Sequence, residues 1–156
     1  MKTLVVYYSR TGLTKKVAEK LTAAIGADKE EIIDKDKRAG AIGYLKSGRD
    51  AMQKRLAVIE DPKISPADYD LVIIGTPTWA YSMSAPVRAY LTGQAGRFKQ
   101  VAFLATHGSD GGDKAIKQMA ELSGRKAKAA LVVTSREVSQ DKFQEKLEKF
   151  ISELNN

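Results

Sequence analysis

The sequence contains no cysteine and only one histidine, His107, and these two scarcities exclude several kinds of chemistry. A chain without thiols forms no disulfide, offers no thiolate nucleophile and builds no cysteine-ligated metal site. One imidazole is too few for a multi-histidine metal site. Demanding chemistry must therefore come from a bound cofactor or from hydroxyl and carboxylate groups.

Long apolar runs are also missing. No stretch approaches the roughly 20 residues of a membrane-crossing helix, so we predict no membrane span. The short apolar run at residues 4–8 is followed by no small-residue cleavage site and is interpreted as a strand. A length of 156 residues with 43% apolar and 29% charged residues is typical of one globular domain, which we predict over residues 1–156.

Acidic charge is scarce relative to basic charge, and the net charge is +7. Such an excess attracts nucleic acids, anionic membranes or acidic proteins. The aromatic residues (7%) are not interleaved with the basic ones, so base-stacking platforms look absent and we predict no nucleic-acid binding. Much of the excess lies in residues 37–55, where Asp50 is the single acid beside Lys37, Arg38, Lys46, Arg49, Lys54 and Arg55.

Short apolar runs alternate with longer amphipathic segments along the chain. We expect strands at residues 3–8, 31–34, 71–75, 101–105 and 129–134, most of them nearly continuous in apolar residues, as in a parallel sheet covered on both faces. Helices are expected at residues 13–25, at 42–56, from Pro86 to Gly93, from a cap at Asp113 to Gly124, and after a cap at Ser139.

This alternation predicts an α/β fold, a three-layer doubly wound sandwich around a five-stranded parallel sheet of order 2-1-3-4-5. Right-handed crossovers place the reversal of chain direction between strands 1 and 3. Ligands of such sheets bind beyond the carboxyl ends of the strands at that reversal. The loops after strands 1, 3 and 4 are therefore expected to converge.

The first of these loops, residues 9–14, offers three hydroxyl groups and Gly12 directly before a helix. Unpaired N–H groups and the helix dipole favour an anion there. The loop has no lysine and matches neither GxxxxGK[ST] nor GxGxxG, so a monophosphate is a better candidate ligand than a triphosphate or a dinucleotide. The alternative is an ordinary Ser/Thr-rich helix cap.

The other two loops are also unusual. Residues 76–84 hold the only tryptophan, Trp79, which either stacks on a flat ligand or packs onto the adjacent helix. Residues 106–113 are rich in glycine and polar groups, and they either turn N–H groups towards a ligand or form a flexible connection. His107 either tunes such a ligand near neutral pH or bonds to the backbone.

Together the three loops resemble those of flavodoxins and flavodoxin-like FMN proteins, over nearly the whole chain. The most specific piece is Ser9-x-Thr11-Gly12-x-Thr14 after an apolar strand, which is similar to the FMN phosphate loop of that family. Other users of this strand order fit poorly. A response-regulator receiver needs an aspartate where strand 3 ends in Gly75-Thr76, and a small tyrosine phosphatase needs a cysteine.

The resemblance implies a flavodoxin-like fold that carries FMN and transfers one or two electrons, in the cytoplasm. It implies that the phosphate is held by Ser9, Arg10, Thr11, Gly12, Leu13 and Thr14, that the ring is lined by Thr76, Pro77, Thr78, Trp79, Ala80 and Tyr81, and that the ring edge meets Thr106, His107, Gly108, Ser109 and Asp113. No catalytic side chain and no metal are implied.

Three features depart from electron-carrying flavodoxins, which are typically acidic. The basic surface would need a redox partner with an acidic docking surface, and it predicts a less negative flavin potential. The third loop lacks the aromatic residue that many flavodoxins stack on the outer face of the flavin, and Ala80 and Tyr81 stand where the second loop often has glycine. An electron carrier is the first hypothesis, and an FMN-dependent reductase of quinones or other small oxidants is the alternative.

Overall fold

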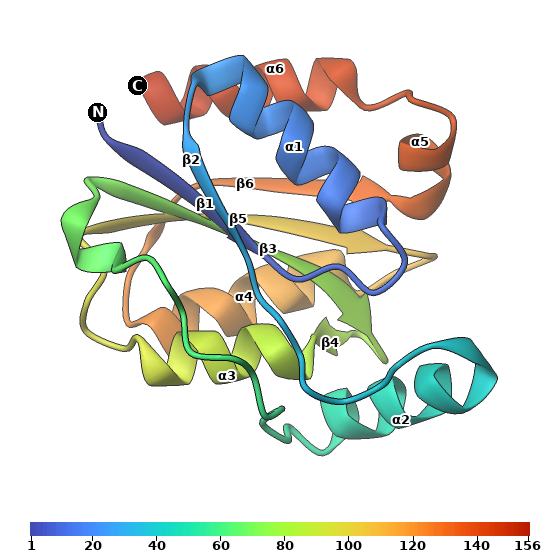
Figure 1. Cartoon of the computed structure of the whole chain (residues 1–156). Coiled ribbons are helices and arrows are strands. Elements are labelled where there is room, and N and C mark those ends of the chain that lie inside the picture. Colours follow the sequence, from blue (N-terminus) through green and yellow to red (C-terminus); the bar gives the residue numbers. More distant parts are fainter.

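The apolar runs of the sequence form the inner strands of a sheet that lies between two layers of helices (Figure 1). The computed structural model describes residues 1–156. Its strands are β1 (Thr3–Tyr7), β2 (Asp28–Glu31), β3 (Leu71–Trp79), β4 (Ser82–Met83), β5 (Gln100–His107) and β6 (Ala127–Thr134). Five of them pair in parallel in the order β2-β1-β3-β5-β6, and β4 pairs antiparallel with the end of β3. The predicted doubly wound sheet and its order are confirmed, with β4 as an addition.

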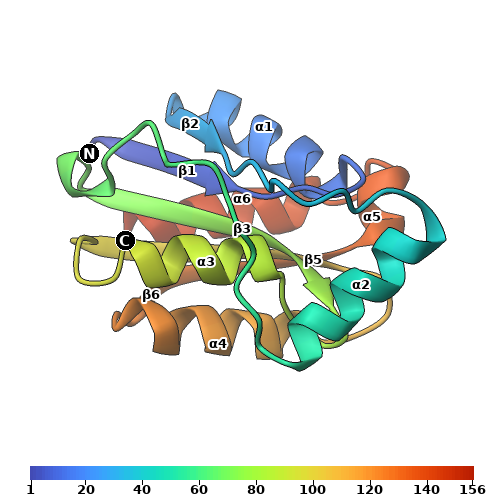
Figure 2. The same cartoon turned by 60° about the horizontal axis from the view of Figure 1, so that its bottom comes forward.

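Helices cover both faces of this sheet, as Figure 1 and Figure 2 show. One face carries α1 (Leu13–Ile25), α5 (Ser135–Ser139) and α6 (Gln144–Asn155), and the other carries α3 (Ala85–Gly93) and α4 (Gly112–Ser123). A short 3-10 helix, Pro66–Asp68, precedes β3, and α2 (Gly40–Met52) lies at the periphery in both views. None of the helices combines the length and apolar character that a membrane crossing requires.

Two hydrophobic cores result, because successive side chains of a strand point to opposite faces of the sheet. Val6 and Ile74 pack in the core beneath α3 and α4, whereas Val5 and Ile73 pack in the core beneath α1 and α6. Burying both faces of the inner strands explains their nearly continuous apolar sequence. It also fixes the strand ends, and with them the loops at the carboxyl edge.

Three predicted boundaries were wrong. The second strand pairs with β1 over Asp28–Glu31 and not over residues 31–34, because an apolar pattern locates buried side chains such as Ile32 and not the hydrogen-bonded register. Ser139 ends α5 and does not cap the last helix, since Thr134 and Glu137 form a capping box that starts α5 directly after β6. Gly111, and not Asp113, occupies the N-cap position of α4.

Helix α2 is present, but it spans Gly40–Met52 and not residues 42–56, so Leu56 lies outside it, and its large apolar residues do not face the protein. Its inward residues are small or polar and include Gly43, Ser47 and Ala51. Its large apolar residues point outward, with 84% of Ile42 and 70% of Leu45 exposed. Gly43 is required on the inner side, because a Cβ there would lie 2.1 Å from the backbone carbon of Arg38. Close packing against this backbone explains why the small side of α2 faces the protein.

Candidate functional site

The loops after β1, β3 and β5 meet at the carboxyl edge of the sheet, as the topology predicts. The Thr14 and Thr106 hydroxyl oxygens lie 2.7 Å apart and join the first loop to the third. The second and third loops touch at Gly111, where a Cβ would lie 2.6 Å from Cα of Tyr81. Residues that are far apart in the sequence therefore form one continuous site.

The first loop ends in a helix N-terminus that no side chain caps. Gly12 has a φ of 95° and occupies the N-cap position of α1. The Ser9 hydroxyl is turned towards the loop and accepts the N–H of Gly12 at 3.1 Å. The N–H groups of the first helical turn have no partner within the helix, and Thr11 and Gly12 are exposed to solvent. This arrangement leaves N–H groups available to an anion.

Arg10 leaves this loop in another direction. Its guanidinium donates to the backbone carbonyl of Arg38 at 3.3 Å and lies 5.5 Å from the ring centre of Tyr44 on α2. Arg10 thereby links the first loop to the segment that precedes α2 and to α2 itself. Its predicted contact with a phosphate remains a prediction.

The second loop is a β-hairpin with a two-residue turn. Thr78 pairs with Met83 and Trp79 with Ser82, so Ala80 and Tyr81 form the turn with φ values of 46° and 62°. Left-handed backbone at two successive residues other than glycine is strained, by roughly 1–2 kcal/mol per residue. Such strain persists where the surroundings impose it, and it gathers at functional sites.

Hydrogen bonds at its base and side hold this hairpin in place. The Ser84 N–H donates to the Thr76 hydroxyl at 3.0 Å. On α4, Gln118 accepts the Met83 N–H at 3.0 Å and donates to the Ser82 hydroxyl at 3.2 Å. The side chain of Tyr81 stays at the tip, with 58% of the residue exposed.

Trp79 is more enclosed than a free stacking platform. Only 8% of its surface is exposed. Tyr8 meets its ring edge-on at a centroid distance of 5.5 Å, and the Arg38 guanidinium lies 4.9 Å from its ring centre. Burial and the Asp34 carboxylate raise the pKa of Tyr8 to about 12, so its phenol stays neutral. Protein packing thus occupies part of the ring, and a role of Trp79 against a flavin remains a prediction.

Arg38 is the main residue that the sequence pattern misplaced. It was counted in a basic surface, yet only 4% of it is exposed. It donates to the carboxylates of Asp34 and, at 3.0 Å, Asp50. Burial works against the charge of Arg38, but these hydrogen bonds outweigh it and raise the pKa of Arg38. The one signal available in the sequence was Asp34 four residues before it.

In the third loop, two glycines lie where neighbouring atoms leave no room for a Cβ atom. Gly111 has a φ of 93°, and a Cβ on Gly112 would lie 2.4 Å from Val132 and 3.0 Å from the His107 ring. The His107 Nδ1 atom is buried without a hydrogen-bond partner. The backbone carbonyl of His107 accepts a hydrogen bond from the Ser135 hydroxyl at 3.2 Å. Three further predicted residues of this loop region are exposed, namely Gly108, Ser109 and Asp113.

Two cavities flank the hairpin. One, of about 450 Å³, lies between α2 and the hairpin and is lined by Tyr44, Leu45, Gly48, Arg49, Met52, Gln53, Thr78, Trp79 and Ala80. The other, of about 840 Å³, lies on the side of the third loop, with Tyr81, Asp110 and Asp113 in its wall. Thr78 Oγ1 is buried without a partner beside the first cavity. An unpaired buried hydroxyl destabilises the protein unless a ligand or a water molecule provides its hydrogen-bond partner. Helix α2 therefore forms one wall of the site.

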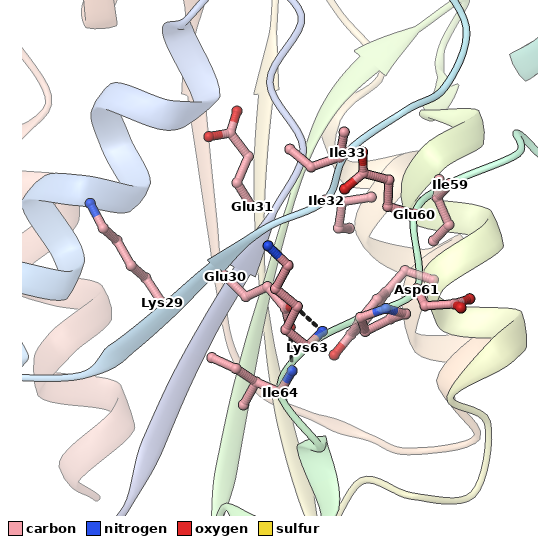
Figure 3. A pocket seen from close by; sticks show the side chains of 12 residues that line it. Lys29, Glu30, Glu31, Ile32, Ile33, Ile59, Glu60, Asp61, Lys63 and Ile64 are labelled. Atoms are coloured by element: carbon pink, nitrogen blue, oxygen red, sulfur yellow. Dashed lines mark hydrogen bonds between the residues drawn. The ribbon is translucent and has the colours of Figure 1, made fainter.

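A third cavity, of about 320 Å³, lies away from the three loops, between β2 and residues 59–64 (Figure 3). One of its carboxylates, Glu30, accepts the backbone N–H groups of Lys63 and Ile64. This carboxylate therefore holds the crossing segment beside the edge strand. We assign it a structural role.

Comparison with known proteins agrees with this geometry. A family model described as flavodoxin matches residues 2–150. A flavoprotein of Lactobacillus acidophilus NCFM, crystallised in complex with FMN, is 26% identical and superposes with a TM-score of 0.71 over 92% of this chain and 98% of its own. No curated protein sequence matches.

Two further solved structures share the fold. A Bacteroides eggerthii protein is 23% identical, with a TM-score of 0.75 over 96% of this chain and 98% of its own. The apo form of an NADH:FMN oxidoreductase is 16% identical, with a TM-score of 0.61 over 99% of this chain and 87% of its own. At these identities the likeness concerns the fold alone.

Proposed function

The chain belongs to the flavodoxin family and binds FMN, and we propose that it works as an electron carrier that passes electrons to a separate redox partner. Bound FMN supplies one-electron and two-electron transfer. The protein's own part is to bind the cofactor, orient it and control what reaches it. No side chain is assigned to bond-breaking chemistry.

The residues at the carboxyl edge of the sheet carry the kinds of chemical group that FMN binding requires. The uncapped start of α1, with Ser9, Thr11 and Gly12, suits a phosphate monoester, because its free N–H groups and hydroxyls donate to phosphate oxygens. The hairpin and the third loop offer an aromatic ring, an unpaired hydroxyl and turn amides for a flat polar ring system. The complete proposed set is Ser9, Arg10, Thr11, Gly12, Leu13 and Thr14 for the phosphate, and Thr76, Pro77, Thr78, Trp79, Ala80, Tyr81, Thr106, His107, Gly108, Ser109 and Asp113 for the ring.

The observation that carries the assignment is the direct hydrogen bond between Thr14 and Thr106. It puts the uncapped N-terminus of α1 beside the third loop, so that one molecule with a phosphate and a flat ring can bridge them. The test is titration of the cofactor-free protein with FMN and with riboflavin, followed by quenching of flavin fluorescence. A 1:1 complex with FMN and much weaker binding of riboflavin are expected. Equal affinities would remove the phosphate site.

Thr78 allows a sharper test of the ring site. Its unpaired hydroxyl is expected to bond to bound FMN, so Thr78→Val should weaken FMN binding roughly five- to tenfold, the value of one hydrogen bond of about 1–1.4 kcal/mol. The same variant should be as stable as the wild type, or more so, without FMN, because an unsatisfied polar group is removed. Thr92→Val, on the exposed side of α3, is the matched control. Unchanged FMN affinity in both variants would place the ring elsewhere.

The cavity between α2 and the hairpin favours a second candidate function, an FMN-dependent reductase of quinones or other small oxidants. Its volume of about 450 Å³ and its apolar lining suit a small aromatic substrate. Steady-state oxidation of NADH or NADPH by a quinone in the presence of the FMN-loaded protein tests this function. Turnover that stops when Gly48→Leu narrows the cavity favours the reductase, and reduction of FMN without quinone-dependent turnover favours the carrier.

The partner of the carrier is proposed to be acidic where it meets the site. Lys54 and Lys114 lie in the wall of the cavity beside Tyr81, and neither makes an ion pair. These free cations attract carboxylates of a docking protein and speed its approach at low salt. We place the protein in the cytoplasm, as its family suggests.

A further inference from the structure

Helix α2 presents an apolar ridge to solvent. Ile42, Leu45 and Met52 are 84%, 70% and 72% exposed, and they recur at helical spacing on the side opposite the buried residues Gly43 and Ala51. The helix lies at the edge of the molecule in both views (Figures 1 and 2). An apolar face of this kind without a partner in the chain marks an interaction site, because single exposed apolar residues rarely align in this way.

Free positive charge lies in the segments just before and just after α2. Lys37 and Arg55 are exposed and form no ion pair. The acidic residues near α2 already form ion pairs, since Asp36 pairs with Lys46 at 3.2 Å and Asp50 pairs with Arg38 at 3.0 Å. The surface therefore combines an aliphatic crest, formed by Ile42, Leu45 and Met52, with basic flanks, formed by Lys37 and Arg55.

Two occupants fit this combination poorly. A second copy of the chain, joined across a two-fold axis, would bring the basic flanks of the two copies close together. A docking protein is usually anchored by Trp, Tyr and Arg in pockets, with Leu under-represented among the energetically dominant residues. Here the crest is built from Ile, Leu and Met, and the cavities that Leu45 and Met52 border lie beside the hairpin rather than on the outer side of α2.

We propose that the outer face of α2 docks onto an anionic lipid bilayer. Helices that lie in the membrane interface bury an aliphatic face among the acyl chains while their lysines and arginines meet anionic headgroups. Tyr44, which is 65% exposed, lies beside the crest, and tyrosine is enriched at the level of the headgroups. Leu45 and Met52 also line the cavity beside Trp79, so docking sets the mouth of the redox site at the membrane surface.

The experiment is flotation of the FMN-loaded protein with vesicles of phosphatidylglycerol and phosphatidylcholine, compared with vesicles of phosphatidylcholine alone. Binding to the anionic vesicles is expected, and it should weaken as salt is added. In Leu45→Trp, the fluorescence of the introduced ring should shift to shorter wavelength with anionic vesicles only. Trp79 is buried and provides a constant background.

Paired variants separate the two components of the surface. Ile42→Ser with Leu45→Ser removes the crest and should lower vesicle affinity at least tenfold. Lys37→Glu with Arg55→Glu reverses the flanks and should lower it by tens-fold or more, since each basic residue near an anionic surface contributes about fivefold. Lys126→Glu with Lys128→Glu, at the opposite end of the sheet, changes the net charge equally and should leave most of the binding intact. Circular dichroism confirms that each variant is folded.

Four results would overturn the proposal. Failure of the wild type to float with anionic vesicles at low salt removes it directly. Equal losses in the flank pair and the Lys126/Lys128 pair would mean adsorption by net charge alone. A flank effect without any crest effect would instead indicate a polar docking surface for an acidic protein, and a dimer in sedimentation that the crest variant dissociates would indicate self-association.

Discussion

The hairpin turn at Ala80 and Tyr81 invites replacement by the sequence that such turns prefer. Both residues have positive φ, at 46° and 62°, in a two-residue connection between β3 and β4. Turns of this shape favour Asn-Gly, because asparagine tolerates left-handed backbone and glycine adopts it freely. The double variant Ala80→Asn with Tyr81→Gly is therefore expected to stabilise the cofactor-free protein.

The size of the gain follows from two opposing effects. Left-handed strain is worth roughly 1–2 kcal/mol per residue, and glycine removes it at position 81 while asparagine relieves part of it at position 80. Glycine also makes the unfolded chain more flexible, which costs about 0.5–1 kcal/mol. Tyr81 is 58% exposed, so its removal sacrifices little buried area. A net gain of about 1 kcal/mol remains, which corresponds to a rise in Tm of about 2–4 °C for a chain of this size.

Urea denaturation of the cofactor-free protein, monitored by circular dichroism and Trp79 fluorescence, measures this gain. Tyr81→Ala is the control, because it removes the aromatic ring but keeps the strained backbone. Its stability should equal that of the wild type or fall below it. A double variant no more stable than Tyr81→Ala would refute the strain argument.

The same variants report on the role of the strain. Strain in the hairpin is explained if the strained shape is the one that binds FMN. In that case the Asn-Gly variant should unfold at higher urea concentration but bind FMN more weakly, and loss of the Tyr81 ring should account for part of the weaker binding. The fluorescence titration with FMN separates the two effects, since Tyr81→Ala shows what the ring alone contributes. Improved affinity in the Asn-Gly variant would contradict this view of the turn.

Three further predictions concern single side chains. Thr14→Val should destabilise the protein by about 1–2 kcal/mol in urea, because the buried Thr106 hydroxyl loses its partner, whereas Thr14→Val with Thr106→Val should be nearly neutral; additive losses would contradict a direct bond. Asp50→Asn should cost about 3 kcal/mol at pH 7. Burial opposes the charge of Asp50, but hydrogen bonds from Arg38 and Arg49 lower its pKa, so its contribution is complete above the unfolded pKa of about 4 and fades below it; the stability gap between the variant and the wild type should therefore narrow as the pH falls below about 4, and a constant gap would refute this. Lys54→Glu should lower the potential of bound FMN by about 40–140 mV at low salt, twice the effect of one charge at about 10 Å; an unchanged potentiometric titration would place this charge too far from the ring.

The sequence anticipated the layout of the molecule well. Continuous apolar strands and amphipathic helices in alternation predict a doubly wound sheet, and the observed order confirms it. The loop at residues 9–14 lies where it was expected, directly before α1, because Gly12 and its hydroxyl neighbours are local signals that act over a few residues. Agreement extends to the meeting of the first and third loops, which follows from the topology.

Side-chain environments were harder to anticipate. Arg38 looked like one of several surface cations, yet Asp34 and Asp50 hold it inside the protein against Trp79. For Trp79 the sequence left open whether it stacks on a ligand or packs onto the protein, and contacts with Tyr8 and Arg38 cover part of its ring. The positive φ values of Ala80 and Tyr81 have no local signature, since neither residue type favours them. They arise because the pairing of β4 with β3 leaves only two residues for the turn.

The sequence by itself determined the period and order of most elements, because hydrophobic spacing acts locally. It placed Ile42, Leu45 and Met52 on one face of a helix. Only the tertiary structure decided that this face turns outward, since the backbone around Arg38 comes so close to Gly43 that only small side chains fit between them. A periodic pattern states which residues share a side of a helix. Which side is buried depends on the neighbouring backbone, which here leaves the apolar side of α2 beside the flavin site and open to a partner.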